Sequence, residues 1–193
     1  MRKIVAVEHL SLDGVMQSPG AANEDTRGEF SQGGWAAADN DEVLGAELGK
    51  GMGNAELLFG RLTYEKMYAA WPNAPQPNPF TDLMNNTPKY VVSATLAEPL
   101  DWMNSSLLTD AGAVAELKDT PGPDLVILGS GVLVQALMAR DLVDEYKLLV
   151  HPVVLGSGRR LFPGGGVPAH LRLTDCVTTT TGVLITTYQP KEA

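Results

Sequence analysis

Short apolar runs alternate along most of the chain with segments whose apolar residues recur every three or four positions. Continuous apolar runs are typical of strands buried on both faces, whereas the wider spacing is typical of helices. We therefore predict strands at residues 3–10, 55–59, 90–93, 125–128 and 145–155. Helices are predicted at residues 39–52, 62–70, 110–118 and 132–139. Asp39 or Asn40 would cap the first of these helices.

The end of the chain has a different pattern. Two apolar segments, residues 171–180 and 183–189, flank Thr181-Gly182, a pair typical of a hairpin turn. Alternating strands and helices followed by successive strands predict an α/β fold with three α/β/α layers. The central sheet would be mostly parallel, with an antiparallel C-terminal hairpin.

Two stretches lack a clear period. Residues 14–38 hold one proline and several glycines, and a loop of that length in a compact domain is typical of a lid or binding loop. A disordered surface loop is the alternative, but Phe30 and Trp35 favour a loop that covers something. Residues 71–88 contain five prolines, which predict an irregular connection.

Composition limits the classes of partner. The 193 residues are 44% hydrophobic and 19% charged, as expected for one folded domain spanning residues 1–193. A net charge of -9, with no run of more than two Lys or Arg, argues against nucleic acid as a partner. No apolar stretch approaches the ~20 residues of a membrane span. Cys176 is the only cysteine, so no internal disulfide can form, and we expect a cytoplasmic protein.

Two glycine turns, about seventy residues apart, carry the strongest chemical signal. They are FGRLTYE at residues 59–65 and LGSGV at residues 128–132, and each joins a predicted strand to a predicted helix. Backbone N–H groups at a helix N-terminus bind phosphate, and Arg61 can fork onto one. Two such turns predict a ligand with phosphates at more than one place, such as a dinucleotide. Either turn alone is also compatible with a steric glycine turn or a simple N-cap at Thr63.

These motifs resemble a known family. FGRLTYE resembles the cofactor-binding turn of dihydrofolate reductases. The sequences VILGSG (126–131), LVDE (142–145) and PVVLGSGRRLF (152–162) resemble the reductase domain of the bifunctional riboflavin-biosynthesis deaminase-reductase, and SLDG (11–14) fits the same family. The resemblance covers residues 3 to about 188 and implies a dihydrofolate reductase-like fold that binds NADPH.

The resemblance also implies a set of cofactor-binding residues. Those around the adenosine-side phosphates would be Gly60, Arg61, Leu62 and Thr63. Those near the 2′-phosphate would be Ser93, Ala94 and Thr95. Those holding the pyrophosphate on backbone amides would be Gly129, Ser130, Gly131, Val132 and Leu133.

Substrate residues are expected at the end of the first strand and in the loop after it. Hydride transfer needs a proton source, and Asp13 is the best single carboxylate for that catalytic role. An Asp-Gly turn residue is the alternative for Asp13, and a structural histidine is the alternative for His9. Substrate contacts are expected from His9, Gly14, Trp35 and an acid on the following helix, for which we take Asp41 over Asp39 and Glu47. The scattered histidines and single cysteine predict no metal site.

The chain departs from its apparent relatives at some positions. Val132 stands where dihydrofolate reductases often place a second basic residue. Tyr64-Glu65-Lys66-Met67 stands where the riboflavin-pathway enzymes carry an acidic pair and a proline, and no deaminase sequence is present in the chain.

We therefore expect an NADPH-dependent oxidoreductase whose small-molecule substrate is a pterin- or pyrimidine-like heterocycle or a C=N or C=O compound. The alternatives are the 5-amino-6-(5-phosphoribosylamino)uracil reductase of riboflavin biosynthesis and a non-catalytic nucleotide-binding or small-molecule-binding module. Apolar residues in the C-terminal strands also predict a homodimer.

Overall fold

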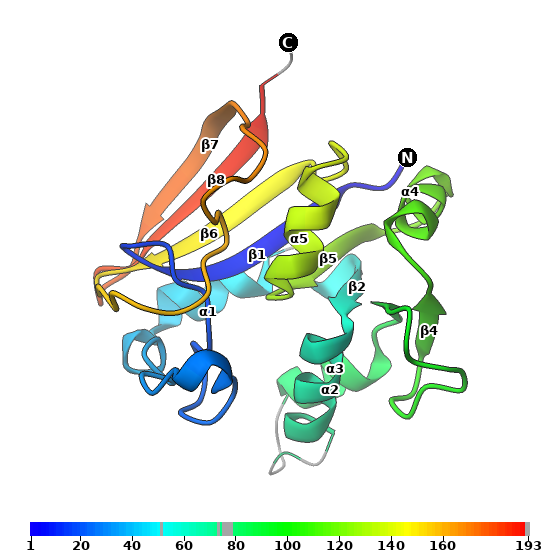
Figure 1. Cartoon of the computed structure of the whole chain (residues 1–193), viewed down its shortest axis with the longest axis horizontal. Helices are drawn as coiled ribbons and strands as arrows, with labels where there is room; N and C mark the ends of the chain where they lie inside the picture. Colours follow the sequence, from blue (N-terminus) through cyan, green and yellow to red (C-terminus); the bar gives the residue numbers. More distant parts are fainter. Residues whose placement is uncertain (51, 73, 75–78, 192–193) are drawn as a thin grey trace.

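One eight-stranded sheet forms the centre of the protein (Figure 1). The computed structural model describes residues 1–50, 52–72, 74 and 79–191. In spatial order the strands are β4, β3, β2, β5, β1, β6, β8 and β7. Their bounds are β1 Ile4–Ser11, β2 Ala55–Gly60, β3 Lys89–Val92, β4 Ser105–Leu108, β5 Asp124–Leu128, β6 Glu145–His151, β7 Leu171–Thr178 and β8 Leu184–Pro190. The pairs from β4 through β6 are parallel, and β6–β8 and β8–β7 are antiparallel.

Helices cover both faces of this sheet. They are α1 Glu42–Gly49, α2 Arg61–Ala70, α3 Pro79–Asn86, α4 Ala111–Asp119 and α5 Gly131–Met138. One buried cluster joins Ala6 and Leu10 of β1 to residues of α4 and α5. The other joins Val7 of β1 to residues of α1, α2 and α3. Because side chains alternate along a strand, β1 contributes to both clusters and lies at the middle of three layers. The predicted three-layer, mostly parallel architecture with an antiparallel C-terminal pair is confirmed.

The sequence analysis missed two elements. The predicted irregular connection at residues 71–88 contains α3, although residues 73 and 75–78 of it lie outside the described part. Phe80, Leu83 and Met84 recur at helical spacing and pack on the cluster below α3. A proline at the first helical position costs no backbone hydrogen bond, so Pro79 does not prevent the helix. The short edge strand β4 was also missed, because its sequence SSLL has no clear strand pattern.

One predicted helix and one predicted strand extend beyond the observed elements. The helix predicted at 39–52 is confined to Glu42–Gly49, where Asp41 rather than Asp39 or Asn40 is the N-cap. The Asp41 side chain accepts the Leu44 N–H at 2.7 Å. The strand predicted at 145–155 ends at His151 because Pro152 has no N–H for the ladder.

The long loop after β1 is attached to the rest of the structure by buried side chains and hydrogen bonds. It holds only two short 3₁₀ turns, Arg27–Glu29 and Ala37–Asp39, yet Phe30 and Gln17 are buried. Gln17 accepts the Arg159 N–H at 3.0 Å, which ties the loop to the glycine-rich segment after β6. These contacts favour the prediction of a binding loop over that of a disordered one. Among the helices of the described residues, none has the length and apolarity to cross a membrane.

Candidate active site

The two glycine turns meet at the carboxyl ends of neighbouring parallel strands. Gly60 is the last residue of β2, and Ser130 follows β5, which pairs with β2. The Gly60 N–H donates to the Ser130 hydroxyl at 3.0 Å. A Cβ added to Gly129 would lie 3.7 Å from the Thr63 methyl, so the turns touch. Residues 69 positions apart, Gly60 and Gly129, thus form one structural unit.

The second turn has an unusual backbone at two successive residues. Gly129 and Ser130 have φ values of 63° and 62°, in the left-handed region that a serine rarely adopts. Helix α5 begins directly afterwards at Gly131, and α2 begins at Arg61 directly after the first turn. The first N–H groups of each helix lack an intrahelical acceptor and carry partial positive charge. Two helix ends of partial positive charge therefore border the same space.

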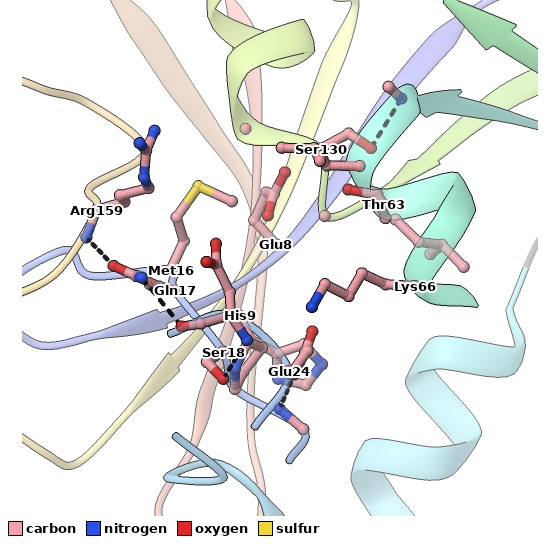
Figure 2. A pocket seen from close by; sticks show the side chains of 18 of the residues that line it. Glu8, His9, Met16, Gln17, Ser18, Glu24, Thr63, Lys66, Ser130 and Arg159 are labelled. Carbon is pink, nitrogen blue, oxygen red and sulfur yellow. Dashed lines mark hydrogen bonds between the residues drawn. The ribbon is translucent and has the colours of Figure 1, made fainter. Parts of the chain in front are cut away.

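That space is a cavity of about 1510 Å³. Typical pockets for drug-sized ligands span roughly 300–1,000 Å³, so this one has room for a larger ligand. Its walls come from β1, the loop after β1, α1, α2, the turn before α5 and the segment after β6. Figure 2 shows Lys66 extending from α2 toward the cavity, with Arg159 on the opposite wall. These cations and the helix ends supply positive potential in a protein of net charge -9.

Glu8 of β1 is a buried acid in this cavity that the sequence analysis missed. Its side chain points into the cavity on the side of Ser130 (Figure 2). Glu8 is 1% exposed, and its Oε1 has no hydrogen-bond partner in the described part of the chain. Burial raises the pKa of Glu8 to about 8, so the carboxyl is mostly protonated at neutral pH. The available signal was a lone carboxyl inside an apolar run predicted to be a buried strand.

His9 follows Glu8 and also lines the cavity, as predicted for a substrate residue. Its Nδ1 lies 2.9 Å from Nε2 of His151. The other nitrogen of His151, Nδ1, lies 2.7 Å from Oδ2 of Asp39. Burial, reinforced by the nearby His151, lowers the pKa of His9 to about 4. The His9 ring is therefore neutral at physiological pH.

The structure places Asp13, the predicted proton donor, outside the cavity wall. Its Oδ1 accepts the Ser11 hydroxyl at 2.7 Å and the Leu155 N–H at 3.1 Å. The Gly156 N–H and the Arg160 guanidinium donate to Oδ2. These hydrogen bonds, that from Ser11 first, hold the pKa of Asp13 well below its usual range. A carboxylate that stays ionised cannot donate a proton, so the geometry does not favour the predicted role. Asp13 instead joins the loop after β1 to the segment after β6.

Three predicted substrate residues also lie outside the cavity wall. Gly14 has φ 80° and forms the turn that ends β1. The Trp35 indole N–H donates to the Gln17 carbonyl at 2.8 Å. Asp41 caps α1 and accepts the Thr180 N–H at 2.7 Å. Gly14, Trp35 and Asp41 thus lie around the cavity without lining it, and substrate contact from them stays a prediction.

Most predicted cofactor residues do line the cavity. They are Gly60, Arg61, Leu62, Thr63, Gly129, Ser130, Gly131, Val132 and Leu133. The three predicted near the 2′-phosphate, Ser93, Ala94 and Thr95, lie just beyond the wall, after β3. Val92, at the end of β3, lines the cavity and pairs with Gly60. Ser93 is buried, and its hydroxyl accepts the Thr95 N–H at 3.1 Å.

Arg61 is held by an exposed ion pair with Glu65. Its guanidinium lies 3.0 Å from Glu65, but the side chains are 42% and 41% exposed. An exposed ion pair of this kind contributes little to stability, so an incoming phosphate can compete with Glu65 for Arg61.

No group of three or more His, Cys, Asp or Glu residues in the described ranges is arranged to hold a metal ion.

Comparison with known proteins places this arrangement in a family. Residues 2–185 match the family model of the RibD C-terminal domain. The chain belongs to this family. Two uncharacterized proteins of Bacillus subtilis, YyaP and YwjB, are each 30% identical to it. The match to YyaP covers 68% of this chain and 72% of YyaP, and the match to YwjB covers 55% and 57%.

Solved structures identify the fold of this RibD C-terminal domain protein. A candidate riboflavin biosynthesis protein from Shewanella sp. PV-4 is 20% identical, with a TM-score of 0.67 over 98% of this chain and 99% of that one. A pyrimidine reductase-like protein from Corynebacterium diphtheriae is 11% identical, with a TM-score of 0.63 over 100% and 93%. Dihydrofolate reductase from Enterococcus faecalis, complexed with NADP(H), is 15% identical, with a TM-score of 0.60 over 98% and 97%. The predicted dihydrofolate reductase-like fold is confirmed.

Proposed function

We propose that this RibD C-terminal domain protein is an NADPH-dependent reductase. Its substrate would be a small pterin- or pyrimidine-like heterocycle, or another compound with a C=N or C=O bond. The observation that carries the proposal is the meeting of two helix N-termini at a cavity that also holds a buried carboxyl, that of Glu8, without a hydrogen-bond partner for its Oε1 among the described residues. The family supports a reductase, and a dihydrofolate reductase of the same fold binds NADP(H).

The residues present fit a dinucleotide. At Gly60 a side chain would extend toward Ser130 and Leu133, so glycine leaves the backbone open where the turns meet. The left-handed residues Gly129 and Ser130 lead directly into α5, whose first N–H groups lack intrahelical acceptors and can bind an anion. The pyrophosphate would lie at residues 129–133, held by the amides other than those of Gly129 and Leu133, which donate to the Val7 and Ser130 carbonyls. The adenosine-side phosphates would lie at residues 60–63. Arg61 and residues 93–95 would meet the 2′-phosphate. When bound, the cofactor supplies the hydride.

The protein itself supplies exclusion of water and a proton. Apolar side chains of the wall, including Met16, Met52 and Phe80, limit the access of water to the reacting atoms. Glu8 holds a proton at neutral pH and can donate it to the heteroatom beside the carbon that receives the hydride. Hydride and proton together add two hydrogens across one double bond.

The uracil reductase of riboflavin biosynthesis is the second candidate, because the matched family model is that of the RibD C-terminal domain. Growth of a riboflavin auxotroph lacking its own reductase separates the two candidates. Rescue by this chain would assign the pathway activity. Failure to rescue, together with NADPH oxidation on other heterocycles, would exclude it.

The proposal is tested at Val132, which lines the cavity at the start of α5 and is 68% exposed. Val132→Asp places a negative charge at the helix end, and Val132→Asn is the neutral control of matching size. We expect the Asp variant to bind NADPH at least about tenfold more weakly than the Asn variant, as measured by nicotinamide fluorescence. Equal affinities would contradict the cofactor site.

Turnover is tested separately. Wild-type protein, NADPH and a panel of pterins, pyrimidines, imines and aldehydes are mixed, and loss of the absorbance of reduced nicotinamide is followed. Oxidation that depends on one class of compound supports the reductase. Saturable NADPH binding without oxidation across the panel would instead indicate a non-catalytic binding module.

A further inference from the structure

The cavity extends from the two glycine turns to a second end beside the C-terminus of α2. Residues that line it occur along the whole helix, from Arg61 at the N-terminus to Ala70 at the C-terminus and Trp71 directly after it. An α-helix rises by about 1.5 Å per residue, so Trp71 lies about 15 Å along the helix axis from Arg61. The phosphates of the cofactor would lie at the Arg61 end. The Trp71 end is therefore left for another part of a ligand.

Five apolar side chains line this second end, which we call the apolar end of the cavity. The Trp71 indole N–H donates to the sulfur of Met67 at 3.2 Å. Phe80, in the first turn of α3, stands edge-on to Trp71, with ring centroids 4.6 Å apart. Leu48, in the last turn of α1, and Met52, shortly after α1, complete the set. All five line the cavity and pack in or against one buried cluster.

The exposed surface of the apolar end consists of carbon and sulfur. Its side chains other than Met52 are only half-buried, so apolar surface faces the cavity. The Trp71 N–H, the only strong side-chain donor of the set, is already bound to Met67. A charged or hydroxylated group placed here would lose its hydrogen bonds to water without replacement. The apolar end therefore favours an uncharged, apolar part of a ligand.

The kinds of apolar side chain narrow the choice further. Two of the five are aromatic and two are methionines. Aromatic rings attract another ring through offset or edge-to-face contacts, and thioether sulfur attracts the edge of a ring. Methionine also adapts its shape to a flat partner. A planar aromatic group fits this combination of side chains better than a branched alkyl group does.

We propose that the apolar end binds an uncharged aryl group of the substrate. The proposal rests on the proposed function, whose substrate class it narrows to aryl-substituted heterocycles and aryl-substituted C=N or C=O compounds. It also disfavours the uracil reductase, because a phosphoribosyl group would bring hydroxyls and negative charge to the carbon and sulfur of the apolar end.

The first test locates an aryl probe through methionine methyl groups. In full-length protein carrying ¹³C-labelled methionine methyls, Met67→Leu and Met52→Leu identify two of the seven signals by their loss. We expect 4-phenylpyrimidine to shift both signals in the wild-type protein, because an aromatic ring changes the magnetic field at nearby methyl groups. The signal of Met16, identified by Met16→Leu, reports the end beside α5, since a Cβ added to Gly131 would collide with Met16. A shift of the Met16 signal alone would overturn the proposal.

The second test compares probes that share the pyrimidine ring. Pyrimidine itself has no aryl group, and 4-(pyrimidin-4-yl)benzoate carries a carboxylate on the aryl group. Lys66 also lines the cavity, so the benzoate tests whether this cation governs affinity instead. We expect 4-phenylpyrimidine to bind at least about tenfold more tightly than either control, as measured by titration of the methionine signals. Equal affinity for either control, or no binding of 4-phenylpyrimidine, would contradict the proposal.

The third test changes the apolar end itself. Met67→Glu introduces a negative charge at nearly constant length, and Met67→Gln is the neutral control. We expect the Glu variant to bind 4-phenylpyrimidine at least about tenfold more weakly than the Gln variant, because a bound aryl group would strip water from the carboxylate. Equal affinities in two folded variants would count against the apolar end. The backbone amide spectrum reports folding, and if either variant does not fold, the wild-type titrations still decide.

These outcomes are separable from those of the reductase proposal. NADPH binding without a preference for 4-phenylpyrimidine would contradict this inference alone. Preference for 4-phenylpyrimidine in a protein that does not bind NADPH would contradict the reductase alone. Displacement of 4-phenylpyrimidine by NADPH would assign the apolar end to the cofactor and overturn the inference.

Discussion

Two carboxyls only five positions apart in sequence show how far environment decides chemistry. Asp13 accepts four hydrogen bonds and stays ionised, whereas Glu8 is buried beside an apolar cluster and keeps its proton. The sequence favoured Asp13 because it follows a predicted strand. The groups that hold Asp13 include Leu155, Gly156 and Arg160, which lie about 140 residues away in the chain. No local pattern contains that information.

Glu8 should make the stability of the protein fall as pH rises. Its pKa lies near 8 in the folded state and near 4.5 in the unfolded chain, so unfolding releases a proton between these values. The free energy of unfolding then decreases with pH, by at most about 1.4 kcal/mol per pH unit. His9 contributes the opposite slope around and below its ordinary pKa of 6.5, because its folded pKa is lowered. Lys89, whose pKa burial lowers to about 8, contributes the opposite slope near and above pH 8. Comparison of urea unfolding with that of a variant that lacks the Glu8 carboxyl therefore isolates Glu8.

The matched variant is Glu8→Gln, which keeps the shape and cannot ionise. We expect it to lose the downward slope of unfolding free energy between pH 6.5 and 8 and to be more stable than wild type at the upper end. If the slopes of the two proteins coincide, Glu8 is not protonated in the folded state. With any substrate found in the panel, Glu8→Gln should also lower kcat.

Arg61 carries the choice between cofactors. Arg61→Ala should weaken NADPH binding more than NADH binding, because only NADPH has the 2′-phosphate that a guanidinium can fork onto. Fluorescence titration with both cofactors measures the ratio. Equal losses of affinity for the two cofactors would remove the 2′-phosphate contact from the proposal. Glu65→Gln, which removes the ion pair with Arg61 and keeps the guanidinium, serves as the control.

Among the elements, the strand-turn-helix units were the most predictable. Apolar runs followed by glycine located β2 with α2 and β5 with α5 to within a residue or two. The sequence analysis missed helix α3 because the five prolines of residues 71–88 outweighed the helical spacing of Phe80, Leu83 and Met84. Its stability comes from packing on a distant part of the core, which no local propensity reports.

Ser130 links the two units, and its variants should separate the link from the backbone. Ser130→Ala loses the bond to the Gly60 N–H and keeps a side chain in the left-handed region. Ser130→Gly loses the same bond but removes that backbone cost, about 1–2 kcal/mol. We therefore expect the Ala variant to be less stable than the Gly variant by about that amount in urea unfolding. The reverse order would show that the left-handed backbone at residue 130 is not strained.

At the scale of the whole molecule, the cavity joins distant parts of the chain. Its walls include residues from 7 to 164, so a bound dinucleotide would contact segments that lie far apart in the sequence. The sequence predicted the convergence of the two turns, because both follow parallel strands whose ends share one edge. The sequence could not show that the loop after β1 forms a wall of the cavity, because the position of this loop depends on distant contacts such as that of Gln17 with Arg159.

NADPH should therefore stabilise the protein as a single unit. At a concentration one hundred times its Kd, a ligand that binds only the folded state adds about 2.7 kcal/mol. Thermal unfolding followed by circular dichroism should show one transition whose midpoint rises with NADPH concentration. A midpoint that NADPH leaves unmoved would argue against the cofactor.

The homodimer stays a prediction. Strand β7 forms one edge of the sheet, and Leu173 on it and Leu184 on β8 are 50% and 41% exposed. Unpaired strand edges with apolar side chains are typical contact surfaces between copies. Sedimentation should give twice 20.6 kDa, and Leu173→Lys should shift it toward one copy. A wild-type mass of one copy would contradict the prediction.

The adjacency of Glu8 and His9 ties folding accuracy to chemistry. Glu8 and His9 are consecutive residues of β1, so their side chains lie on opposite faces of the sheet. Both nevertheless line the same cavity. A slip of β1 by a single residue between β5 and β6 would exchange the two groups and bury a would-be donor among helices α1 to α3. Correct pairing of β1 with β5 and β6 is therefore the folding step that places the Glu8 carboxyl and the His9 imidazole on their proper sides of the sheet.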